Sequence, residues 1–145
     1  MGQNGTSGST SPPNRLPGET LGGLQVQVTQ RSGYAVVTAA GTIDLTTGQL
    51  LDQALEQVAE LTRAAVLLDI AAVRFCDSSG LKVFVRWHHK LERQGMSLVV
   101  CAASDPLART FALTGLDQAL YQRPDVGEAL RWLDTGHTRL TSARP

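Results

Sequence analysis

The segment from Val73 to Leu81 contains the side chains whose types and spacing point most clearly to chemistry. The carboxylate of Asp77 and the hydroxyls of Ser78 and Ser79 stand where an apolar, helix-like pattern begins, and Gly80 follows with room for close approach. A serine that projects into solvent here is a candidate phosphoryl acceptor, because free backbone N–H groups and the positive end of a helix dipole favour a phosphate at a helix start. The simpler interpretation is an N-cap, in which Asp77 or Ser78 accepts a backbone N–H. The loop by itself leaves both interpretations open.

Two adjacent histidines raise the question of an enzyme. A catalytic pair of Ser78 and His88 would need the imidazole at the serine, yet ten residues of helix separate the two by about 15 Å along the axis. His88 is expected on the packed face of its helix and His89 in solvent. The chain also has no glycine-rich loop with a P-loop lysine. We therefore expect no catalytic residue, no metal ligand and no cofactor, and the chain is not expected to be an enzyme.

Composition narrows the class of protein further. The 145 residues carry 13 basic and 13 acidic side chains, a balance that argues against nucleic acid as a direct partner. No apolar run approaches the roughly 20 residues that span a bilayer, and the start of the chain lacks the layout of a signal peptide. Cys76 and Cys101 have no CxxC spacing and are expected to be buried structural thiols. These features predict a reduced, cytoplasmic protein with no membrane partner.

The folded part is expected to occupy residues 24–134. Residues 1–23 are rich in Gly, Pro, Ser, Thr and Asn, and such a segment cannot bury enough surface to offset its ordering entropy, so it is predicted to be disordered. Residues 135–145 lack periodicity and are predicted to be a flexible tail.

Hydrophobic periodicity inside the domain alternates between strand and helix. Strands are expected at residues 24–30, 34–40, 64–70 and 98–102, and helices at 46–61, at 80–94, from 105 to 115 and from 124 onward. Strand–helix–strand units in series give right-handed crossovers and parallel central strands, and the first hairpin adds an antiparallel edge. The predicted fold class is α/β, a single domain with a mixed, mostly parallel sheet of four to five strands and about four helices.

Several motifs together resemble a known family. The segment from Phe75 to Leu81 resembles the characteristic loop of the STAS domain, specifically of the bacterial anti-sigma factor antagonists. Gly41 to Asp44 is similar to the Gly-x-Leu-Asp motif that closes the family's second strand, and Thr114 to Leu116 is similar to its later Thr-Gly-Leu ending. The resemblance covers residues 24–133, which is nearly the whole predicted domain.

The resemblance implies a regulator of transcription that works by partner switching. Such an antagonist, when unphosphorylated, binds an anti-sigma factor that is itself a serine kinase, and so releases a sigma factor. The kinase switches the antagonist off by phosphorylating it, and a separate serine phosphatase restores it. The alternative is a STAS protein-interaction subunit of a signalling or transport complex that does not use this phosphorylation.

The resemblance also assigns roles to individual residues. The phosphorylated serine is the one directly after the loop aspartate, which here is Ser78. Asp77, Ser79, Gly80 and Asp44 are implied as its neighbours at the partner-binding surface, where Asp44 either caps the following helix, presents the site, or does both. Lys82 stands where the family often has glycine, and a lysine one helical turn from Ser78 can pair with the phosphate or alter the partner surface.

Overall fold

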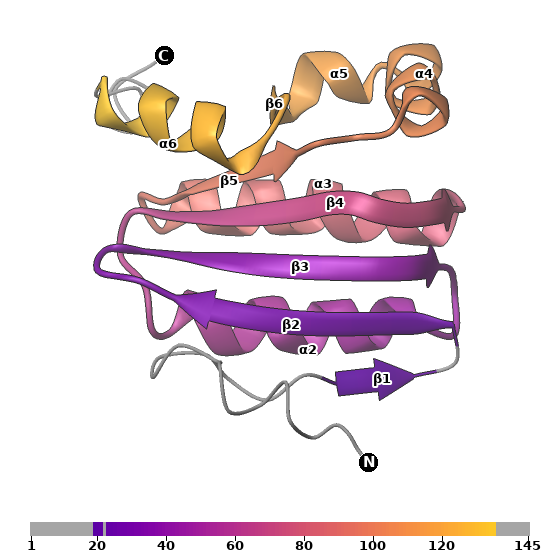
Figure 1. The fold of residues 1–145 in the computed structure, drawn as a ribbon, viewed down its shortest axis with the longest axis horizontal. Helices are drawn as coiled ribbons and strands as arrows, with labels where there is room; N and C mark the ends of the chain where they lie inside the picture. Colours follow the sequence, from indigo (N-terminus) through magenta and orange to yellow (C-terminus); the bar gives the residue numbers. More distant parts are fainter. Residues whose placement is uncertain (1–18, 22, 136–145) are drawn as a thin grey trace.

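The computed structural model describes residues 19–21 and 23–135 as one mixed sheet with helices on both faces (Figure 1). The sheet has six strands in chain order. The strands are β1 (Glu19–Leu21), β2 (Leu24–Gln30), β3 (Tyr34–Ile43), β4 (Ala65–Cys76), β5 (Ser97–Cys101) and β6 (Tyr121–Arg123). The helices are α2 (Gly48–Ala59), α3 (Ser78–Arg93), α4 (Asp105–Thr114), α5 (Leu116–Ala119) and α6 (Val126–Asp134).

The strand pairing confirms the predicted α/β class. β1, β2 and β3 form an antiparallel edge, and β3, β4, β5 and β6 run parallel to one another. Helices connect the parallel strands, as right-handed crossovers require. In the described part of the chain, two short elements exceed the prediction: β1 is a strand beyond the expected four to five, and α5 is a fifth helix.

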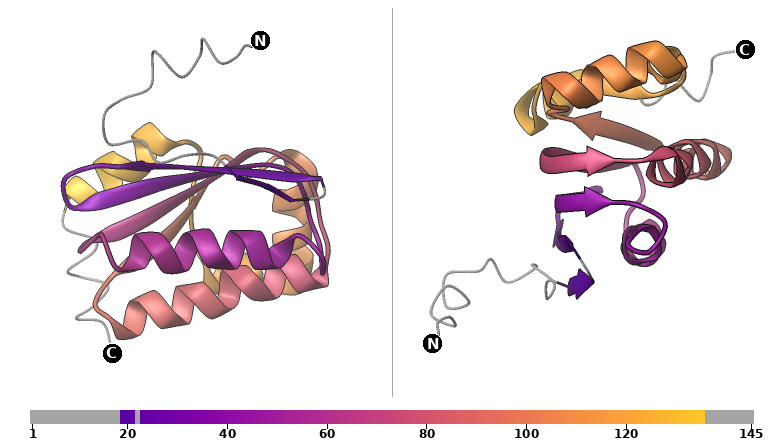
Figure 2. Two further views of the ribbon diagram at one scale, coloured as in Figure 1. Left: turned by 90° about the horizontal axis from the view of Figure 1, so that it is seen from below. Right: turned by 90° about the vertical axis from the view of Figure 1, so that its right-hand side faces the viewer.

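Two clusters of buried side chains lie on opposite faces of the sheet. α2 and α3 lie side by side on one face, and α6 lies on the other (Figure 2). β4 supplies alternate residues to both clusters, with Val66 and Leu68 on the α2–α3 side and Ala65 and Leu67 on the α6 side. This arrangement explains the nearly continuous apolar run of β4, because a strand covered on both faces has no wet side.

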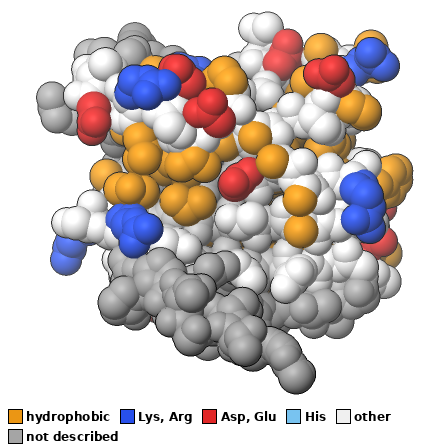
Figure 3. All heavy atoms as spheres, in the orientation of Figure 1, with side chains coloured by type: hydrophobic (Ala, Val, Ile, Leu, Met, Phe, Trp, Pro, Cys, Tyr) orange, Lys and Arg blue, Asp and Glu red, His pale blue; other side chains and the backbone are white. Residues whose placement is uncertain are grey.

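Apolar side chains gather on the surface of the face that carries α6, beside that helix (Figure 3). Within the described residues, no helix is both long and apolar enough to span a bilayer.

The N-terminal boundary differs from the prediction. Residues 1–23 were expected to be disordered, but Glu19–Leu21 forms β1 and pairs antiparallel with the outer side of β2. A strand of three residues has no periodicity that a sequence pattern could show, which is why composition alone misplaced it. Of the rest of the two expected tails, Gly23 and Thr135 are described, and residues 1–18, 22 and 136–145 lie outside the described residues.

β4 is longer than the apolar run that predicted it. The expected strand ended at Ile70, whereas β4 continues to Cys76. Its pairing with β3 shifts register twice. Thr38 pairs with Asp69, but Ala40, two residues further along β3, pairs with Ala72, which is three residues further along β4. A second shift follows before Cys76. Each shift adds one residue to β4, as a β-bulge does. The bulges break the two-residue alternation of buried side chains, so this half of the strand was interpreted as a loop.

One carboxylate joins the two helices on the main face. Asp52 of α2 accepts hydrogen bonds from the Trp87 indole nitrogen at 2.6 Å and from the Arg86 guanidinium at 2.7 Å, both on α3. Burial raises the pKa of Asp52, but these hydrogen bonds and the charges of Arg86 and Lys90 outweigh it, so the pKa lies below the ordinary value of 3.8. The charged form of Asp52 therefore stabilises the packing of α2 against α3.

We expect Asp52→Ala to destabilise the domain more than Asp52→Asn does. The alanine variant leaves the N–H of Trp87, whose side chain is almost fully buried, without an acceptor, a loss of about 1–3 kcal/mol. The asparagine variant keeps an acceptor oxygen. Urea unfolding at neutral pH measures the difference, and equal stability of the two variants would contradict the assignment.

The same variants test a pH dependence. The pKa of Asp52 is lower in the folded protein than the ordinary value of 3.8. The carboxylate therefore contributes fully to the free energy of unfolding above pH 3.8, and this contribution is lost as the pH falls through the folded pKa. The free energy of unfolding of the wild type should fall as the pH drops below 3.8, partly because this carboxylate becomes protonated. Asp52→Asn has no carboxylate at this position, so its free energy of unfolding should fall less over the same pH range.

Candidate functional site

Ser78 is the first residue of α3, at the end of the molecule where parallel strands finish. The backbone N–H of Asp77 donates to the carbonyl of Ile43 at 3.1 Å, and Ile43 pairs with Cys76 in the sheet. These contacts attach the start of α3 to the carboxyl ends of β3 and β4. In open α/β sheets this edge is where binding sites collect.

Asp77 is the N-cap of α3. Its backbone is extended, and its carboxylate accepts the N–H of Gly80 at 3.1 Å. The sequence left Asp77 and Ser78 as alternatives for this role, and the structure assigns it to Asp77. The Ser78 side chain is exposed and makes no hydrogen bond to any residue the structure describes. Its hydroxyl is therefore available to a reagent arriving from solvent.

Gly80 lies at a tightly packed position. It was expected to leave room near Ser78, but it is buried, and a Cβ built on it would lie 2.5 Å from the Cys76 sulfur and 2.7 Å from Cγ2 of Ile43. Real Cβ atoms essentially never come so close, so a larger residue would push α3 away from the sheet. The place of Gly80 in the site is to let α3 approach β3 and β4.

Asp44 caps the turn between β3 and α2. One of its oxygens accepts hydrogen bonds from the backbone N–H groups and the hydroxyls of both Thr46 and Thr47. The hydrogen bond from the Thr46 hydroxyl, followed by that from the Thr47 backbone, lowers the pKa of Asp44. Asp44 was considered as the cap of the following helix, but the N-cap of α2 is Thr47, and Asp44 instead holds the turn that precedes the helix. Both Asp44 and Ser79 line the same hollow on the surface.

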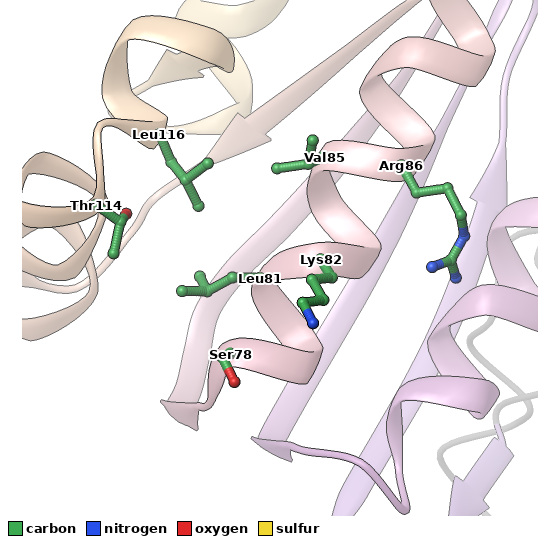
Figure 4. A pocket seen from close by; sticks show the side chains of 7 residues that line it. All are labelled: Ser78, Leu81, Lys82, Val85, Arg86, Thr114 and Leu116. Carbon is green, nitrogen blue, oxygen red and sulfur yellow. The ribbon is translucent and has the colours of Figure 1, made fainter.

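Two hollows flank the first turns of α3. The apolar groove, about 480 Å³, lies between α3 and the α4–α5 segment (Figure 4) and is lined by Ser78, Leu81, Lys82, Val85, Arg86, Thr114 and Leu116. The polar hollow, about 380 Å³, lies between α3 and α2 and is lined by Asp44, Leu45, Gly48, Gln49, Asp52, Ser79, Lys82, Val83 and Arg86. Lys82 and Arg86 line both hollows and so form a ridge between them.

The two cations of the ridge differ in their partners. Arg86 is held by Asp52, whereas Lys82 is exposed and forms no ion pair with any residue of 19–21 or 23–135. The apolar groove has no acidic side chain in its lining. The structure thus brings Ser78 and Lys82 together on one groove, and Ser79, Asp44 and Lys82 together on the other hollow.

The exposure of several apolar side chains at this end of the molecule was not predicted from the sequence. Leu45, next to Asp44, is 78% exposed, and Phe75, near the end of β4, is 55% exposed. Leu116 lines the apolar groove from α5. Periodicity cannot reveal such residues, because only the assembled fold shows that they stay uncovered. Exposed apolar groups around a polar centre are typical of a surface that binds another protein.

The histidine and the two cysteines considered in the sequence line neither hollow. His88 makes an edge-to-face contact with Tyr121 at 5.3 Å between ring centres and lines neither hollow. Cys76 and Cys101 are both buried and free, as expected. Burial, with the charge of Asp77 adding to it, raises the pKa of the Cys76 thiol to about 12, and burial raises that of Cys101 likewise.

This fold and loop belong to a known class of domain. The family model for the STAS domain matches residues 25–129. The chain therefore belongs to the STAS domain family.

Proteins named as anti-sigma factor antagonists are among those similar to this chain. The anti-sigma-F factor antagonist RsfB of Mycobacterium tuberculosis is 31% identical over 121 residues, which cover 83% of this chain and 90% of the relative. The anti-sigma-B factor antagonist of Listeria monocytogenes is 32% identical over 107 residues, covering 72% and 93%. A crystal structure of an anti-sigma factor antagonist from Mycobacterium paratuberculosis superposes with a TM-score of 0.68 at 31% identity, covering 74% and 92%.

Gly80→Ala should destabilise the domain by about 1–3 kcal/mol, because the added methyl group overpacks the contact with Ile43 and Cys76. Gly48→Ala is the matched control, since Gly48 is also a buried glycine at a helix start but its Cβ would meet only Val83, at an ordinary 3.6 Å. Thermal unfolding followed by circular dichroism compares them. Equal melting temperatures would show that α3 yields at Gly80 without cost.

The thiols should be inert in the folded protein. With a pKa of about 12 for both, about one thiol in 10,000 is ionised at pH 8, and the thiolate is the reactive form. Iodoacetamide should alkylate both cysteines in urea and neither under native conditions, as read by peptide mass spectrometry. Rapid native labelling of Cys76 would instead indicate a reactive thiol beside the site.

Proposed function

We propose that this chain is an anti-sigma factor antagonist that binds an anti-sigma factor serine kinase while Ser78 is unphosphorylated and releases it once Ser78 is phosphorylated. The observation that carries the proposal is the exposed, unbonded Ser78 hydroxyl at the first position of α3, at the mouth of an apolar groove. Relatives named as anti-sigma factor antagonists support it. A regulator of this kind acts in the cytoplasm, where sigma factors work.

The phosphoryl transfer needs both nucleotide and base from the kinase. Oγ of Ser78 attacks the γ-phosphorus of ATP bound to the kinase, so that the Oγ–P bond forms, the bond to ADP breaks and the serine proton passes to a base on the kinase. The carboxylate nearest in sequence, Asp77, is engaged as the helix cap. A serine phosphatase reverses the step by hydrolysis, which yields the free Ser78 hydroxyl and inorganic phosphate.

A phosphate on Ser78 would change the surface more than the fold. The modification adds about −1.5 to −2 charge at neutral pH, and the N-terminus of α3 tolerates an anion there. A partner that fills the apolar groove would have to bury this charge or face it, at a cost of several kcal/mol. Release of the partner with retention of the fold is therefore the expected result.

The switch is tested with three variants. Ser78→Ala should fold, bind a candidate anti-sigma factor kinase constitutively and take up no phosphate. Ser78→Asp should fold and bind at least tenfold more weakly, because a carboxylate supplies part of the phosphate charge. Ser79→Ala is the matched control: it removes the neighbouring hydroxyl and should still be phosphorylated. Pull-down assays, and peptide mapping after incubation with kinase and ATP, read out both properties.

Two results would overturn the switch. The first is phosphate found on Ser79 in the wild-type protein, which would move the acceptor by one residue. The second is equal kinase binding by Ser78→Ala and Ser78→Asp, which would favour a STAS interaction subunit that does not use Ser78. Circular dichroism of each variant separates loss of binding from loss of fold.

A further inference from the structure

We propose that Lys82 is the intramolecular receptor for the phosphate on Ser78, so that phosphorylation creates an ion pair within the first turns of α3. The inference rests on the proposed function only in taking Ser78 as the phosphorylated residue. The further step is that the Lys82 ammonium neutralises part of the charge of the phosphate and moves toward it.

The placement of the two side chains supports direct contact. Ser78 and Lys82 are four residues apart on α3, which makes them neighbours on one face of the helix. Both line the apolar groove, and Figure 4 shows the Lys82 amino group on the side of its helical turn that faces Ser78. A phosphoserine offers three acceptor oxygens to an ammonium at this spacing.

Of the two cations that line the hollows beside Ser78, Lys82 is the one that is not already paired. Arg86, one turn further along the ridge, already pairs with Asp52 at 2.7 Å, whereas Lys82 forms no ion pair within the described residues. Two acidic groups lie near the start of α3. The Asp77 carboxylate accepts the N–H of Gly80 as the cap of α3. The Asp44 carboxylate accepts hydrogen bonds from Thr46 and Thr47 in its own turn. The α4–α5 side of the groove contributes only Thr114 and Leu116.

The pair would alter the surface at two places at once. The phosphate stands at the mouth of the apolar groove, and the Lys82 ammonium, which also lines the polar hollow, is drawn toward it. A partner that meets a free ammonium in the unphosphorylated state then meets a paired one. Phosphorylation would thus both add an anion and withdraw a cation from the binding surface.

The test installs phosphoserine at position 78 during translation, so that it needs no kinase. The second ionisation of the phosphate, which lies near pH 6 in the absence of a partner, is followed by ³¹P NMR at physiological salt. An exposed ion pair should hold this pKa about half a unit lower in wild type than in Lys82→Gln. Lys82→Arg should restore the lower value.

Arg93→Gln is the control for net charge. It removes one positive charge from the same helix, but Arg93 lies at the far end of α3, beyond the screening length at this salt. Its phosphate pKa should equal that of wild type. Equal pKa values for wild type and Lys82→Gln, or equal increases in Lys82→Gln and Arg93→Gln, would overturn the proposal. A failed kinase pull-down would contradict the proposed function and leave this titration unaffected.

Discussion

The close approach of Gly80 to Ile43 and Cys76 is the contact on which the rest of the site depends. It leaves no space for a Cβ, and together with the hydrogen bond from Asp77 to Ile43 it fixes the start of α3 against two strand ends. Because Asp77 is then used as the cap, Ser78 falls at the next position, outside the packed interior. The exposure of the serine is thus a consequence of how tightly its neighbours are held.

The second constraint is the way in which α2 is joined to α3. Asp52 binds both Trp87 and Arg86, which holds one face of α3 toward α2 and leaves the opposite face open beside α4 and α5. The apolar groove on that open face exists because α3 is anchored elsewhere. The same ion pair engages Arg86, whereas Lys82 forms no ion pair within the described residues.

The sequence predicted the parts of this fold whose signal is periodic or local. Alternating and helical patterns gave the α/β class, the antiparallel edge and the main helices, and the Asp77 loop was placed correctly at a helix start. It did not predict the second half of β4, where bulges between Asp69 and Ala72 and between Val73 and Phe75 break the alternation. Nor did it predict β1, which is too short to show an alternation. It also did not predict the packing of Gly80 against Ile43 and Cys76, because only the three-dimensional structure reveals what a glycine's missing side chain would touch.

The switch proposed for Ser78 would have to separate its effect on the partner from its effect on the stability of the domain. The arrangement at α3 achieves this separation through position. The buried groups that hold the helix, Gly80, Ile43 and Cys76, lie on the inner side of the turn, whereas Ser78 and Lys82 lie on the outer side. A phosphate added to Ser78 would meet a helix N-terminus and an exposed ammonium, both of which tolerate negative charge, and would touch none of the inner contacts. The proposed modification would therefore act at the surface, where a partner docks, and not in the core that positions the serine.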